Sequence, residues 1–72
     1  SVNYHKVGLL NEAIKSYENY LKIHPNIPEI YVDIGYLYYE IGDYQKAKEY
    51  WLVALRIAPN HKLASNALRK LE

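Results

Sequence analysis

Apolar side chains recur at steps of three and four residues along most of the chain. Between residues 28 and 41 they form a stripe on one side of a helical wheel, and Glu29, Asp33 and Glu40 lie off it. This spacing is the period of an amphipathic α-helix, and the two-residue alternation of a half-buried strand is missing. The stripe consists of Ile30, Tyr31, Ile34, Leu37, Tyr38 and Ile41.

A second stripe, between residues 44 and 57, combines small and large side chains. Ala47 and Ala54 allow a neighbouring helix to come close, and the rings of Tyr44 and Trp51 fill the space beside them. We expect the aromatic residues on the stripes to pack in the core, namely Tyr4, Tyr17, Tyr31, Tyr38, Tyr44 and Trp51.

Glycine, proline and asparagine divide these stripes into helices. Gly8 and Gly42 stand where a helix is expected to stop in a left-handed turn, and Pro28 suits the first position of a helix. Asn26 and Asn60 are residues of the helix-capping type. The expected helices span residues 2–7, 10–23, 28–41, 44–57 and 61–71.

The sequence repeats itself at a constant offset of 34 residues, which is typical of a stacked array of helices. We therefore divide the single domain into a partial first repeat at 1–27, a complete repeat at 28–61 and a C-terminal capping helix at 62–72. The identical pairs include Tyr4 and Tyr38, Gly8 and Gly42, Ala13 and Ala47, Leu21 and Leu55, Pro25 and Pro59, and Asn26 and Asn60.

The chain resembles the tetratricopeptide repeat family, whose unit is a helix-turn-helix of 34 residues. This resemblance implies an all-α fold, a right-handed superhelical stack of antiparallel helix pairs, and a non-catalytic role in binding proteins or peptides. The complete repeat carries the motif at Tyr31, Ile34, Gly35, Tyr38, Gly42, Tyr44, Ala47, Trp51, Ala54 and Pro59, and the first copy keeps Tyr4, Gly8, Ala13, Tyr17 and Pro25.

Three positions depart from the family pattern. Tyr20 stands where the motif has a small residue, so we expect it either to widen the local helix contact or to be relieved by the shortened helix before it, and Leu10 replaces an aromatic residue. Arg69 stands where a small residue is usual, which indicates that the last helix is a solvating cap. Three repeats are the usual minimum for a stable stack, so we expect either a longer natural protein or association with another copy.

In this family the first helix of each pair lines a concave surface. By register that surface would carry Val2, His5 and Lys6, then Glu29, Val32, Asp33, Tyr36, Tyr39 and Glu40, and finally Leu63, Asn66, Ala67 and Lys70. Its acidic, tyrosine-rich centre would favour a partner with basic and apolar side chains. The alternative is that these acids and tyrosines form an ordinary solvated face.

Some members of the family grip the C-terminal carboxylate of chaperone tails with lysine, asparagine and arginine. The matching positions here hold Val32, Asp33, Tyr36, Leu63 and Ala67. We therefore expect no binding of such an acidic tail.

Composition excludes several classes of function. The 72 residues carry a net charge of +1, so charge does not suggest nucleic acid as a partner. No apolar run approaches the ~20 residues of a membrane span, and the absence of cysteine removes disulfides and thiolate sites without fixing the compartment. Because methionine is absent even at position 1, we expect an excised or processed piece of a longer array.

No pattern of catalytic or cofactor-binding residues is present. His5, His24 and His61 lie in different segments without the spacing that places two imidazoles on one helix face, so we expect no metal site. The serines lack a nucleophile-elbow pattern, and the three glycines form no phosphate-binding loop. We expect no enzyme activity and no cofactor.

Two hypotheses for the function follow. In the first, the module is a scaffold in which Val32, Tyr36 and Tyr39 provide the energy of peptide binding and the acids set the preference and register. In the second, it is a structural module that forms a homo-oligomer, in which the N-terminal half-repeat of one copy and the last helix of another complete each other's stacks.

Overall fold

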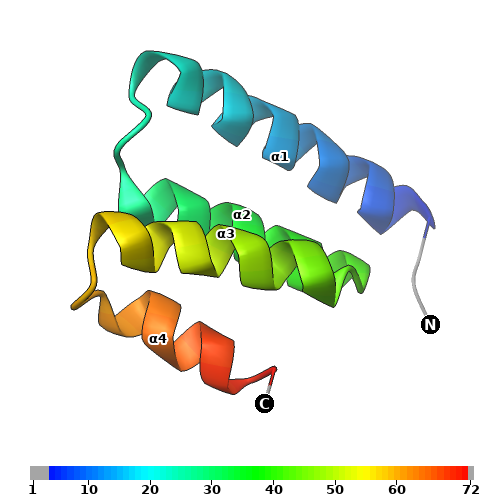
Figure 1. Ribbon diagram of the computed structural model, residues 1–72. Helices are drawn as coiled ribbons and strands as arrows, with labels where there is room; N and C mark the ends of the chain where they lie inside the picture. Colours follow the sequence, from blue (N-terminus) through cyan, green and yellow to red (C-terminus); the bar gives the residue numbers. More distant parts are fainter. Residues whose placement is uncertain (1–3, 72) are drawn as a thin grey trace.

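The computed structural model describes residues 4–71, and their side chains from Lys6 onward. These residues form four helices and no strand: α1 at Tyr4–Ile23, α2 at Pro28–Ile41, α3 at Tyr44–Ile57 and α4 at Lys62–Arg69 (Figure 1). Successive helices run in opposite directions and lie side by side. The all-α fold class is therefore confirmed.

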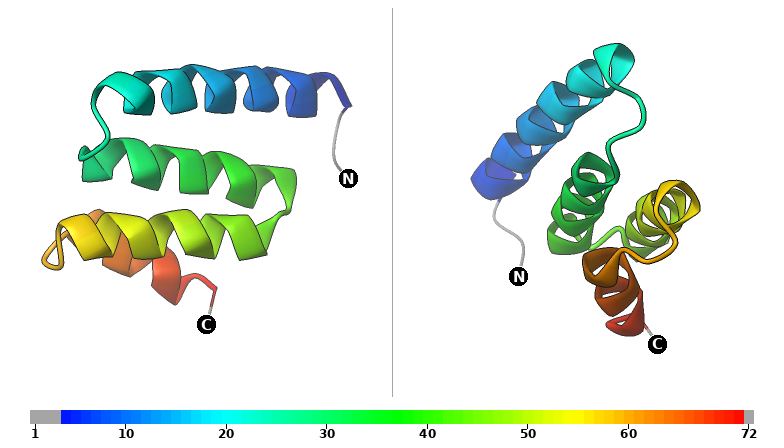
Figure 2. Two further views of the ribbon diagram at one scale, coloured as in Figure 1. Left: turned by 45° about the horizontal axis from the view of Figure 1, so that its top comes forward. Right: turned by 90° about the vertical axis from the view of Figure 1, so that its left-hand side faces the viewer.

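Helix α2 is the element against which the other three helices pack. It forms a tight hairpin with α3, while α1 lies on one side of this hairpin and α4 on the other, as Figure 2 shows from two further directions. Helix α4 packs mainly on α3 and also reaches α2. The surface of α2 is therefore the part of the molecule to which three neighbours can contribute side chains.

The turn between α2 and α3 follows from the residues Gly42 and Asp43. Gly42 has φ +103°, and its N–H donates to the carbonyls of Tyr38 at 3.0 Å and Tyr39 at 3.1 Å, which ends α2. Asp43 then caps α3, because its carboxylate accepts a hydrogen bond of 3.2 Å from the N–H of Lys46. The predicted turn at Gly42 and the predicted bounds of both helices are confirmed.

Helix α1 is continuous through Gly8, so the predicted helix break at that residue is wrong. Gly42 is followed by Asp43, which can cap a new helix, whereas Gly8 is followed by Leu9, which cannot. Without a cap, an isolated glycine costs a helix only about 1 kcal/mol relative to alanine. Tyr20 is exposed, and its ring lies beside that of His24, the residue that follows α1, so it widens no contact between helices.

The predicted asparagine caps are also wrong, because the residues that cap α2 and α4 are Ile27 and His61. Asn60 instead follows Pro59 within a turn, which is closed by a hydrogen bond of 2.9 Å from the N–H of His61 to the carbonyl of Ala58. Nδ1 of His61 accepts from the N–H of Ala64 at 3.4 Å. Helix α4 begins one residue later than expected and ends at Arg69 rather than at residue 71.

Trp51 is the centre of the core. Its side chain has no exposed surface, and its Nε1–H donates to the carbonyl of Val32 at 3.1 Å. A Cβ placed on Gly35 would overlap the indole of Trp51, with Nε1 as its nearest atom, so only glycine allows this approach of α2 and α3. The fully buried alanines that complete the contacts with α3 and α4 are Ala47, Ala54, Ala64 and Ala67.

Not every aromatic residue of the predicted core is buried. Tyr44 is 54% exposed and lies in the first turn of α3, where the ring of Tyr39 is tilted against it at a centroid distance of 5.0 Å. Tyr17, Tyr31 and Tyr38 are half-buried, and the side chain of Tyr4 lies outside the described side chains. The core is therefore built around one indole ring rather than around a full set of tyrosines.

Replacing Gly35 with alanine should destabilise the domain by about 1 to 3 kcal/mol, since the added methyl group overpacks the contact with Trp51. Urea denaturation monitored by circular dichroism measures this free energy of unfolding. Gly8→Ala is the matched control, because nothing lies within 4 Å of the added methyl group. It should stabilise the helix by about 0.5 to 1 kcal/mol. A destabilising Gly8→Ala would contradict the continuous α1.

Ala47→Leu and Ala54→Leu should each cost about 1 to 3 kcal/mol of stability, because both side chains are fully buried against neighbouring helices. Thermal melting checks this expectation, with Gln45→Leu as a control at an exposed position of the same helix. Unchanged melting temperatures for both alanine variants would contradict the packing register of α3.

Candidate functional site

The candidate binding surface lies on α2 and is called here the α2 face. Its predicted members Glu29, Asp33, Tyr36 and Glu40 follow one another at helical spacing, and Tyr39 lies beside them. Lys6 of α1 and Lys70, the C-cap residue of α4, border it from the neighbouring helices. The fold therefore brings predicted site residues from three segments to one face.

The two tyrosines of the α2 face are anchored on the core. The ring of Tyr36 meets Trp51 edge-on at a centroid distance of 5.3 Å, and the ring of Tyr39 is tilted against the same indole at 6.0 Å. Both side chains are half-buried. Their rings thus offer rigid, partly exposed aromatic surface, and they also contribute to stability.

Three contacts join charged or aromatic groups of the α2 face to the neighbouring helices. Nζ of Lys6 lies 3.6 Å from Oε2 of Glu40, and Nζ of Lys70 lies 5.1 Å from the ring centroid of Tyr36. Nε2 of His61 lies 3.7 Å from Oε2 of Glu29. Nδ1 of the same ring accepts from the N–H of Ala64, so the ring is oriented with Nε2 toward this carboxylate.

Asp33 has the most perturbed carboxyl group of the α2 face. Loss of solvation through partial burial raises its pKa above the usual range, and the nearby Glu29 carboxylate raises it further. A hydrogen bond with the side chain of Tyr17 opposes this shift. A cationic group of a partner would favour the ionised form of Asp33.

The structure corrects the prediction for Val32, which is only 2% exposed and belongs to the core. Its position next to the Trp51 contact leaves no surface for a partner. Ala67, assigned by register to the same surface, is also fully buried because α4 turns it toward the core. Val2 lies outside the described residues and the His5 side chain outside the described side chains, while Leu63 and Asn66 are exposed on α4.

Sequence reasoning missed an aromatic cluster between α2 and α3. The ring of Tyr50 is stacked on Tyr38 at 5.5 Å and on Tyr31 at 6.2 Å, and its hydroxyl donates to Glu18 of α1 at 3.1 Å. Burial, followed by the bond to Glu18, raises the pKa of Tyr50 above its usual range. Tyr50 lies outside the apolar stripe of its helix, so periodicity alone gave no signal for it.

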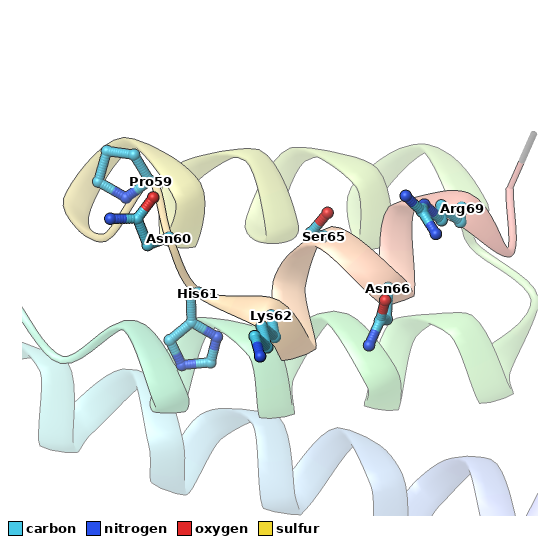
Figure 3. A pocket seen from close by; sticks show the side chains of 7 residues that line it. All are labelled: Pro59, Asn60, His61, Lys62, Ser65, Asn66 and Arg69. Atoms are coloured by element: carbon cyan, nitrogen blue, oxygen red, sulfur yellow. The ribbon is translucent and has the colours of Figure 1, made fainter.

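The outward face of α4 is polar and borders an open cavity of about 280 Å³ (Figure 3). Ser65, Asn66 and Arg69 lie 34 residues after Tyr31, Val32 and Gly35, whose face of α2 packs against α3. In the sequence repeat, Arg69 therefore stands at the position equivalent to Gly35, the glycine that admits the indole of Trp51. The cavity is lined by Pro59, Asn60, His61, Lys62, Ser65, Asn66 and Arg69.

A second cavity, of about 230 Å³, lies between α3 and α4 and is mainly apolar. Leu52, which is 46% exposed, Leu68 and Leu71 line it together with Lys48. It is a candidate surface for a further helix or another copy of the chain.

The described side chains, from Lys6 to Leu71, contain no group of three or more histidine, cysteine or carboxylate residues placed to hold a metal ion. Within the same part of the chain, no helix has both the length and the apolar character needed to cross a membrane.

Comparison with known proteins identifies the family. The family described as "Tetratricopeptide repeat" matches residues 28–61, and that described as "TPR repeat" matches residues 3–42. The protein O-mannosyl-transferase TMTC1 of Mus musculus is 31% identical over 65 residues, which are 90% of this chain but only 7% of that protein. No solved structure is significantly similar. With these matches and its antiparallel helix pairs, the chain belongs to the tetratricopeptide repeat family.

Proposed function

We propose that this domain is a non-catalytic interaction module that binds a peptide segment of a protein partner on the α2 face. Tetratricopeptide repeats generally mediate protein–protein interactions, and the family is typically non-catalytic. The observation that carries the proposal is the combination of half-buried Tyr36 and Tyr39 with three carboxylates on one face of α2.

The aromatic and acidic groups have different roles in this proposal. Tyr36 and Tyr39 are held by Trp51, so their rings lose little freedom when a partner contacts them, and the cost of ordering is small. Glu29, Asp33 and Glu40 carry a combined charge of −3 when ionised. They would attract a basic segment and fix its register, which contributes to specificity and association rate more than to affinity.

The transferase activity in the name of the mouse relative belongs to that protein, of which this chain spans only 7%. A binding role for this domain is compatible with a place inside such a larger enzyme. We therefore propose that the α2 face recognises a protein segment, whatever chemistry a larger protein performs.

The double variant Glu29→Gln and Glu40→Gln should weaken binding of a labelled basic peptide about five- to thirty-fold, because each lost carboxylate removes about 0.5 to 1 kcal/mol of attraction. The remaining binding should depend less on salt. Fluorescence anisotropy at two salt concentrations measures both effects.

The matched control is Glu12→Gln with Glu49→Gln, which removes the same charge from exposed positions of α1 and α3. An equal loss of affinity in both double variants would show that the peptide responds only to net charge. That outcome would exclude the α2 face as the binding site.

Tyr36→Ala should lower both peptide affinity and stability, since the ring packs on Trp51. The lost edge-on contact alone is worth about 0.5 to 1.5 kcal/mol. Tyr36→Phe keeps the ring and should therefore retain both stability and most of the affinity. Calorimetric binding and urea denaturation of both variants provide the measurement, and unchanged binding by folded Tyr36→Ala would contradict the role of this ring.

The apolar cavity between α3 and α4 favours a second candidate function, which is self-association. Covering Leu52, Leu68 and Leu71 with another copy of the chain would remove apolar surface from water. Light scattering over a concentration series should then show oligomers that Leu52→Glu dissociates. A strictly monomeric protein at high concentration would exclude this candidate.

A further inference from the structure

We infer that Lys6 and Lys70 act as internal ligands of the α2 face, each occupying a place that a basic side chain of the partner takes on binding. This inference rests on the proposed function and specifies the partner more closely. It assigns to the two lysines a role opposite to that of binding residues, because each must leave its site before the partner enters.

Lys6 occupies the acidic part of the face. Its Nζ lies 3.6 Å from Oε2 of Glu40, and the two side chains are 63% and 52% exposed. An ion pair this open to solvent contributes at most about a five-fold factor to an equilibrium. The contact is therefore strong enough to compete with a partner and weak enough to be displaced.

Lys70 occupies the aromatic part of the face. Its Nζ lies 5.1 Å from the centroid of the Tyr36 ring, within the range of a cation–π interaction. Part of the same ring is already in contact with the core, because Tyr36 and Trp51 meet in a T-shaped arrangement. A cation from a partner would thus compete with Lys70 for the exposed part of the ring.

The positions of the two contacts define the chemistry of the partner. Glu40 follows Tyr36 by one helical turn, so their attachment points are about 6 Å apart along α2. Alternate side chains of an extended peptide are about 6.6 Å apart and point to the same side. The geometry fits an extended segment with two basic residues separated by one residue.

Arginine suits this segment better than lysine. Its planar guanidinium stacks on an aromatic ring and can also form two hydrogen bonds to one carboxylate. A partner with arginine at both positions would therefore exchange each lysine contact for a stronger one. The internal lysines would then select against segments that carry a single cation.

The test uses a labelled heptapeptide in which two arginines are separated by one alanine and flanked by glycine and serine. A second peptide carries citrulline, the uncharged analogue, in place of both arginines. Lys6→Gln and Lys70→Gln should each raise the affinity for the arginine peptide about two- to five-fold, and the double variant should raise it further. Fluorescence anisotropy measures the dissociation constants, and circular dichroism verifies that the variants remain folded.

Removing any lysine makes the domain more attractive to a basic peptide, so a charge-matched control is required. Lys15→Gln with Lys22→Gln removes two exposed positive charges from α1, away from the α2 face. The inference requires a larger gain in the Lys6 and Lys70 double variant than in this control. An equal gain, or a loss of affinity, would overturn it.

The acidic double variant at Glu29 and Glu40 separates this inference from the proposed function. If affinity falls in the acidic double variant but does not change when Lys6 and Lys70 are replaced, only the internal-ligand role is overturned. Equal binding of the arginine and citrulline peptides by the unmodified domain and all variants would contradict a basic partner for the α2 face altogether.

Discussion

The contact between Trp51 and Gly35 sets the distance between the two central helices. A fully buried indole donates to the backbone carbonyl of Val32 and lies where any side chain on Gly35 would stand. This close approach brings Tyr36 and Tyr39 against the indole, and α4 closes the core with its own buried alanines. Core packing therefore creates the α2 face, because its aromatic residues pack against the buried indole.

Residues at equivalent positions of the two repeats differ in structural role, although the arrangement of the helices is the same. Gly35 admits an indole, whereas Arg69, at the equivalent position of α4, projects from a polar surface. Similarly, Gly42 and Asp43 reverse the chain, whereas Gly8 and Leu9 continue a helix. The α-α solenoid arrangement is common to both halves, and single substitutions decide whether a helix turns, packs or faces solvent.

The sequence predicted α2 and α3 to the residue because their ends carry proline at the start of one helix and a glycine followed by a capping aspartate between them. It did not predict the continuous α1, since a glycine alone does not end a helix. Register placed Tyr36 on the candidate surface but also placed Val32 there, because periodicity does not resolve how deeply a residue at the edge of a stripe is buried. The contacts of Lys6, His61 and Lys70 with α2 depend on tertiary structure and leave no local pattern.

Because Trp51 is buried in one part of the molecule, its fluorescence reports on that part and not on the whole domain. The indole is the only one in the chain, and its cluster contains residues of α2, α3 and α4, whereas among the described side chains of α1 the buried one is Ile14. Tryptophan emission therefore monitors the hairpin and α4, while far-ultraviolet circular dichroism also records the 20 residues of α1. If α1 opens alone, the two signals will separate, and two-state unfolding will describe only the part of the domain that surrounds the indole.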